Sequence, residues 1–194
     1  MKSQKEAFST PLSEYPGRPY RIASDTMNDA QKAIVTRVVA GPRGAVPINL
    51  QIWLNNPGFA EVAERFGCYV SQEAPMTPRA KEIVILVVSA QMDSDFEWYW
   101  HSRLARTHGL TEEQITAIRE KRDPDFSDPL EAVTHALAYG LSERRDVPDA
   151  LHARAMQLLG HSGISDVIGL MGLYTMIAHT INVYRVPLPT PTAL

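Results

Sequence analysis

Apolar residues recur at helical spacing along most of the chain, and helix start and stop signals separate the apolar stretches. Ser24 or Asp25 can cap the first helix, and Gly41-Pro42 ends it. No proline interrupts the predicted elements, so we predict an all-α fold. The expected elements are helices over residues 25–40, 57–72, 78–92, 96–108, 112–119, 127–143, 148–160 and 162–184, and a short segment over 47–54.

The most apolar run, from Ile83 to Val88, has two interpretations. Its β-branched residues are typical of a buried strand. It is preceded, however, by Thr77-Pro78, an N-cap residue followed by proline at the first helical position. This start and the length of the segment favour a helix that is apolar on every side and therefore buried.

The two ends of the chain differ from its middle. Residues 1–23 contain three prolines and few aliphatic side chains. In the last segment, residues 187–194, positions 187, 189 and 191 are prolines. Both are expected to be extended. We predict an N-terminal arm over 1–23, one domain over 24–186 and a tail over 187–194. The chain has 194 residues, 44% of them apolar and 21% charged, which suits one globular domain.

Charge and cysteine content narrow the possible functions. The net charge is −3, and no basic run is long enough to predict binding to nucleic acid or an anionic membrane. We find no secretory leader, and the longest apolar stretch, Val167 to Ile181, is expected to be too short to span a bilayer. The single cysteine, Cys68, excludes an intrachain disulfide, a Cys-x-x-Cys pair and a thiolate zinc cage. We expect a soluble cytoplasmic protein.

The candidate chemistry lies between residues 79 and 109. Glu97 and His101 are four residues apart, so they share one face of a helix, where the carboxylate can orient the imidazole and raise its basicity. Glu82 lies beside the most apolar run, where burial would raise its pKa. These residue types suit general acid–base catalysis.

Structural interpretations of the same residues stay open. Ser94 and Glu97 form a capping-box pattern, in which Glu97 only completes a helix start. Glu82 lies early enough in its helix to interact favourably with the helix dipole. His101 lies among aromatic residues and could be a core histidine with a structural partner.

Metal binding is a further use of these groups. Glu82, Glu97 and His101 could ligate a divalent cation, with His179 as a fourth ligand. His179 also suits an interaction with the last carbonyl groups of its helix. Because the sequence has no His-x-x-x-His or Glu-x-x-His pattern, we predict no metal and no cofactor.

Several short motifs in order carry a family resemblance. They are Gly41-Pro42-Arg43-Gly44, Arg79-Ala80-Lys81-Glu82, Glu97-Trp98-Tyr99-Trp100-His101, Leu104-Ala105-Arg106 and Gly109-Leu110-Thr111. Over about residues 40–190 the chain resembles the carboxymuconolactone decarboxylase family, which includes the alkylhydroperoxidase D-like proteins. The resemblance implies a bundle of antiparallel helices that forms homotrimers or homohexamers, and it favours the helical interpretation of residues 83–88.

The chain departs from the redox members of that family. They carry Cys-x-x-Cys before the histidine, and a preceding glutamate relays the proton. In this sequence the two cysteine positions hold Ser94 and Glu97, the relay glutamate is Glu82 and the histidine is His101. A hydroxyl and a carboxylate cannot cycle through a disulfide, so we expect no dithiol peroxidase activity.

The decarboxylase branch also has Glu-x-x-x-His without a cysteine pair. The resemblance implies cofactor-free acid–base chemistry on a small lactone or keto-type organic acid, with His101 as proton donor oriented by Glu97 or Glu82. Arg43, Ser94 and Trp98 are the predicted substrate-binding residues. Arg43 would clamp a carboxylate, although a structural salt bridge suits it equally. Two alternatives stay open, an antioxidant peroxidase activity through Cys68 alone and a non-catalytic oligomer that binds small molecules.

Overall fold

The computed structural model describes residues 18, 22–41, 44–143 and 146–188, and within these ranges it is helical and contains no strand. The all-α fold is confirmed. The α-helices are α1 (Asp29–Ala40), α2 (Ile48–Trp53), α3 (Pro57–Cys68), α4 (Pro78–Gln91), α5 (Asp95–Thr107), α6 (Glu112–Arg119), α7 (Pro129–Glu143), α8 (Asp149–Leu158) and α9 (Gly160–Tyr184), and a π-helical turn, Tyr69–Glu73, follows α3.

The chain divides into two compact units. The first consists of residues up to 68 together with those from 180 onward, and contains α1, α2, α3 and the end of α9. The second consists of residues 69–179, with the π-helical turn, α4 to α8 and most of α9. All three residues predicted to carry the chemistry belong to the second unit.

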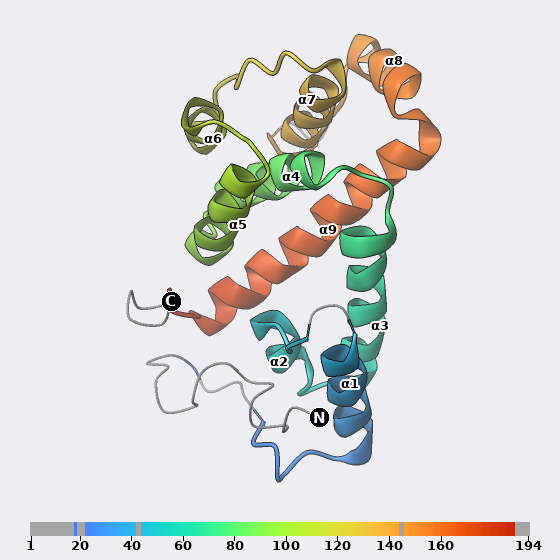
Figure 1. Cartoon of the computed structure of the whole chain (residues 1–194), viewed down its shortest axis with the longest axis vertical. Helices are drawn as coiled ribbons and strands as arrows, with labels where there is room; N and C mark the ends of the chain where they lie inside the picture. The colour runs from blue at the N-terminus through green and yellow to red at the C-terminus, as the bar shows by residue number, and fades with distance from the viewer. Residues whose placement is uncertain (1–17, 19–21, 42–43, 144–145, 189–194) are drawn as a thin grey trace. The chain divides into compact units, whose positions relative to one another are not determined.

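Helix α4 is the centre of the second unit. Thr77 caps it by accepting a hydrogen bond from the Ala80 amide at 3.1 Å, and Pro78 occupies the first helical position, as predicted. Ten of its fourteen residues are buried, since α5, α6 and α7 all pack against it (Figure 1). The run from Ile83 to Val88 is therefore helical, and its apolar side chains are buried on every side.

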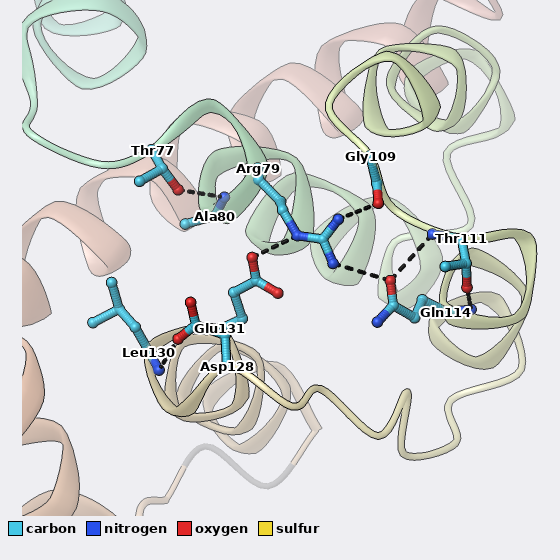
Figure 2. Close-up of polar contacts among 9 residues, drawn as sticks. All are labelled: Thr77, Arg79, Ala80, Gly109, Thr111, Gln114, Asp128, Leu130 and Glu131. Carbon is cyan, nitrogen blue, oxygen red and sulfur yellow. Dashed lines mark hydrogen bonds and ion pairs between the residues drawn. The ribbon is translucent and has the colours of Figure 1, made fainter.

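Arg79 joins the first turn of α4 to three other segments (Figure 2). Its guanidinium donates to Glu131 of α7 at 2.5 Å, to Gln114 of α6 at 3.1 Å and to the carbonyl oxygen of Gly109. The same Gln114 oxygen accepts from the Thr111 amide as part of the predicted capping box of α6. One planar side chain thus joins the start of α4 to the starts of α6 and α7 and to the turn that follows α5.

Some helix starts differ from the prediction. Helix α1 is capped by Asn28 instead of Ser24 or Asp25, and the Asn28 and Gln31 side chains form a capping box. Helix α7 begins at Pro129, where the Asp128 side chain accepts from the Leu130 amide at 2.7 Å. Helix α9 begins at Gly160, before the predicted Ser162. For α1 and α7, a nearby residue of similar capping ability starts the helix.

In the first unit, α1 and α2 pack against α3. The Gln31 side chain donates to the Leu54 carbonyl oxygen at 2.9 Å, and the Trp53 indole donates to the Thr180 hydroxyl at 2.9 Å. The second bond attaches the end of α9 to α2. Most of the predicted arm and tail lie outside the described residues.

Helix α9 has 25 residues and a mean hydropathy of 1.4 over its most apolar window, of which 44% is buried. The helix is longer than the apolar stretch from Val167 to Ile181 on which the sequence-based expectation was based. Gly160 to Asp166 and Asn182 to Tyr184 lengthen it beyond that stretch. Among the described residues it is the one helix with this length and composition, which core helices of soluble proteins also have.

Candidate active site

Helices α4 and α5 bring Glu82, Glu97 and His101 together, as the sequence predicts. The Glu82 carboxylate lies 2.8 Å from His101 Nδ1, and the Glu97 carboxylate lies 3.5 Å from His101 Nε2. Both glutamates are buried, and the His101 side chain is 13% exposed. An imidazole with a carboxylate at each nitrogen is the central feature of the site.

The geometry gives the two carboxylates different roles. A separation of 2.8 Å is a strong hydrogen bond, and because a carboxylate can only accept, His101 Nδ1 carries the proton. At 3.5 Å, Nε2 is too far from Glu97 for a strong bond. Glu82 therefore orients the ring, and Nε2 is the nitrogen that is available to exchange a proton.

Glu97 is not a helix cap. The Ser94 side chain makes no capping hydrogen bond to α5, and the Ser94 amide donates to the Ser89 carbonyl oxygen at 3.0 Å. The capping-box interpretation is therefore wrong, since neither of its two bonds is formed. The backbone turns tightly out of α4 at this point. The Ser94 amide is already hydrogen-bonded to the Ser89 carbonyl oxygen, so it does not require the Glu97 carboxylate as an acceptor.

Burial changes the acidity of Glu97. Loss of solvent raises the pKa of its carboxyl group, and the nearby Glu82 carboxylate raises it further, while His101 opposes both. A carboxyl group with a raised pKa retains its proton to higher pH than an exposed glutamate. Glu97 can therefore hold a proton beside the Nε2 atom of His101.

Ser94 is completely buried at the start of α5. Its hydroxyl is one of the few buried side-chain polar atoms in the described part of the chain that have no hydrogen-bond partner. Ser94, Glu97 and His101 are spaced three and four residues apart, so they follow one face of α5. A buried hydroxyl without a partner is costly, and a bound ligand oxygen would satisfy it.

Tyr174 of α9 is a neighbour of His101 that sequence reasoning missed. Its ring is perpendicular to the imidazole, with the two centroids 5.0 Å apart. Tyr174 lies within a long apolar helix, where an aromatic residue is ordinary, so nothing in its local sequence marks it.

Trp98, another predicted substrate-binding residue, contacts the last residue of α6. The Trp98 ring lies under the Arg119 guanidinium, 4.8 Å from it, and Arg119 also pairs with Asp95 at 2.7 Å. These contacts tie α5 to the end of α6. Arg43 lies outside the described residues.

The remaining candidates are placed as follows. His179 is exposed near the end of α9, and Cys68 is the last residue of α3, in the first unit. Within the described ranges, no group of three or more His, Cys, Asp or Glu side chains has a geometry that could hold a metal ion.

Comparison with known protein families gives a match over residues 57–142 to the carboxymuconolactone decarboxylase family. Over this segment the chain is similar to that family. The segment contains α3 to α6 and most of α7, and so includes Glu82, Glu97 and His101. No curated protein sequence matches the chain.

Solved structures show the same fold in more distant proteins. A protein of unknown function from Agrobacterium tumefaciens, provisionally described as an AhpD antioxidant defence protein, has a TM-score of 0.62 at 16% identity and covers 71% of this chain and 95% of its own. The debrominase Bmp8 has a TM-score of 0.68 at 11% identity, covering 88% of this chain and 91% of its own. A cysteine-to-alanine variant of Bmp8 in complex with 2,3,4-tribromopyrrole has a TM-score of 0.65 at 10% identity, with the same coverage. At these identities the likeness concerns the fold, and the family's all-α architecture is shown.

Proposed function

We propose that this protein is a carboxymuconolactone decarboxylase-like enzyme that performs cofactor-free acid–base chemistry on a small lactone or keto-type organic acid, with decarboxylation as the reaction type. The observation that carries the proposal is the placement of His101 between two buried carboxylates, one at each ring nitrogen. A histidine with a purely structural role needs only one hydrogen-bond partner. The second buried carboxylate, Glu97, has a raised pKa and lowers stability when it is ionised, which is typical of a group that transfers protons.

The side chains divide the work of proton transfer. Glu82 holds the Nδ1 proton and stabilises the imidazolium when it forms. Nε2 accepts a proton from Glu97 and delivers it to the substrate. Glu97, whose pKa is raised by burial, restores the proton on Nε2 after each transfer and then takes up a proton from solvent water.

In a decarboxylation the bond between the carboxylate carbon and the neighbouring carbon breaks, and carbon dioxide leaves. The electron pair of that bond delocalises onto a carbonyl group of the substrate. The resulting enolate carbon then takes a proton from Nε2 of the imidazolium. The number of electrons is unchanged, so neither an oxidant nor a reductant is needed.

Ser94 is suited to bind the substrate carbonyl oxygen. Its buried hydroxyl can donate to an oxygen on which negative charge develops, and the first turn of α5 adds the positive end of a helix dipole. Asp95 and Glu97 in the same turn disfavour a fully charged carboxylate at this point. Arg43 and Trp98 stay predicted substrate-binding residues from the sequence alone, and Arg43 lies outside the described residues.

Turnover of a panel of small carboxylated lactones and β-keto acids tests the proposal. His101→Asn and Glu82→Gln should each lower kcat/KM by about 10²- to 10⁴-fold, the effect of a lost general acid or its orienting partner. His152→Asn, a change of an exposed histidine on α8, is the matched control and should leave turnover unchanged.

Two results would contradict the proposal. One is binding of these acids without any turnover, which would favour a non-catalytic binding protein. The other is dithiol-dependent reduction of an organic hydroperoxide that Cys68→Ser abolishes, which would favour antioxidant chemistry through the single cysteine.

A further inference from the structure

His101 has partners on three sides, and each comes from a different position in the chain. Glu82 of α4 bonds to Nδ1, Glu97 of α5 lies near Nε2, and the Tyr174 ring of α9 stands perpendicular to the imidazole. The first two contacts were expected from the sequence. The third has no role in the proton transfer proposed above.

The orientation of the imidazole determines which atom faces Glu97. Partial rotation about the bond from Cβ to the ring changes the ring plane and carries both nitrogens away from the carboxylates that they face. The Nδ1 bond to Glu82 would then bend or break, and the preference for a proton on Nδ1 would weaken. The contact to Glu97 at 3.5 Å is too long to prevent this rotation. The Glu82 bond acts at one atom only, so a second contact that favours the observed ring plane adds to it.

Tyr174 supplies that contact. Perpendicular aromatic rings attract because the positive edge of one meets the negative face of the other, and centroid distances of 4.5–7 Å are the favourable range. The pair of His101 and Tyr174 has a centroid distance of 5.0 Å and an interplanar angle of 90°. Rotation of the imidazole about its long axis would lose this arrangement.

We propose that Tyr174 is a positioning residue that fixes the plane of His101 through its ring, so that Nδ1 stays on Glu82 and Nε2 stays directed at Glu97. The proposal rests on the proposed function in one respect. The proton transfer of that function is the reason why this ring orientation matters. Because the effect comes from the ring, phenylalanine can replace tyrosine and leucine cannot.

A second pair of histidine and tyrosine provides a matched control. His135 and Tyr139 of α7 are stacked, with centroids 5.9 Å apart and an interplanar angle of 20°. They belong to the same unit, but His135 is not part of the group around His101. Removal of the Tyr139 ring should therefore leave the orientation of His101 unchanged.

Nitrogen-15 NMR of the histidine side chains in the full chain tests the proposal without any substrate. The wild type and Tyr174→Phe should show His101 in one tautomer, with the proton on Nδ1. Tyr174→Leu should raise the population of the other tautomer roughly fivefold, the change expected when an aromatic pair worth about 1 kcal/mol is lost. Tyr139→Leu should leave the His101 signals as in the wild type.

Circular dichroism checks that each variant is folded, and a second variant, Tyr174→Met, keeps the test valid should the leucine variant unfold. Unchanged His101 signals in the folded leucine and methionine variants would overturn the proposal. So would a phenylalanine variant that behaves like the leucine variant, since the hydroxyl would then act instead of the ring. Neither result depends on turnover, so failure of this proposal is distinguishable from failure of the proposed function.

Discussion

At the scale of single residues, the buried carboxyl group of Glu97 makes stability depend on pH. Its pKa in the folded protein is raised above the ordinary value of 4.5, chiefly by burial. The unfolded chain therefore releases this proton more easily than the folded chain. The contribution of Glu97 to stability is fully present below pH 4.5 and is lost as the pH rises through the folded pKa.

Glu97→Gln removes this pH dependence. Glutamine keeps the shape and the hydrogen-bonding capacity of protonated glutamate but cannot become charged. We expect the variant to melt a few degrees above the wild type at pH 8 and close to it at pH 4, since roughly 1 kcal/mol shifts Tm by about 2–4 °C at this size. Thermal melts at both pH values measure the difference. A variant that is less stable than the wild type at pH 8 would show that the ionised carboxylate stabilises the fold.

His135 produces the opposite trend, and the two must be separated in such melts. Burial lowers the pKa of His135 below 6.5, and the Asp123 carboxylate opposes this only in part. Its contribution to stability is present above pH 6.5 and is lost as the pH falls through the lowered pKa. Comparison of Glu97→Gln with the wild type at each pH cancels this effect, since both contain His135.

The sequence predicts part of the site for a clear physical reason. The separation of Glu97 and His101 by four residues is a property of the helix itself, so the shared face follows from the chain alone. The contact of Glu82 with His101 depends on how α4 packs against α5, and was expected only through the family resemblance. Tyr174 could not be found in this way, because its partner is more than seventy residues away and local spacing carries no information about it.

At the scale of helices, short-range signals predict where an element lies better than where it begins. Thr77-Pro78 and the capping box at Thr111 are confirmed because each forms within a single turn. Ser94 has the same pattern and does not cap α5, because its backbone is committed to the preceding helix. The start of α5 is thus decided by the connection from α4 and not by the local motif.

Arg79 is the element-scale residue with the largest expected effect on stability. Arg79→Lys keeps the positive charge beside Glu131 but loses the planar group that also reaches Gly109 and Gln114 (Figure 2). The loss of these bonds should lower the free energy of unfolding by about 1–3 kcal/mol, measured by chemical denaturation.

The matched control for this prediction is Arg122→Lys. Arg122 pairs with Glu120 on the surface, with more than half of both side chains exposed, so the change should be nearly neutral. Equal effects of the two substitutions would mean that Arg79 does not join the helices as described.

At the scale of the whole molecule, α9 has more apolar surface than one copy of the chain covers. Ile168 is 51% exposed and Val183 is 54% exposed. A Cβ atom added at Gly172 would meet no other atom within 4 Å, so another helix can approach there. We propose that this helix mediates self-association, for which the family resemblance suggests a trimer or hexamer.

Substitutions at Gly172 separate assembly from folding. Because the position is open in the single chain, both Gly172→Ala and Gly172→Arg should fold. Alanine should leave the assembly largely intact, and arginine should shift the mass toward that of the monomer by light scattering, since its side chain prevents close helix contact. A wild-type mass of 21.6 kDa at every concentration would contradict self-association.

The most direct test of the proton-transfer unit is nitrogen-15 NMR of the His101 side chain in the wild type and in Glu82→Gln. The structure predicts that the neutral ring carries its proton on Nδ1 in the wild type, where the Glu82 carboxylate accepts it. In Glu82→Gln the share of the tautomer with the proton on Nε2 should rise, because an amide oxygen is a weaker acceptor than a carboxylate. A wild-type ring with its proton on Nε2, or identical tautomer populations in both proteins, would contradict the assignment of Glu82, His101 and Glu97 as one acid–base unit.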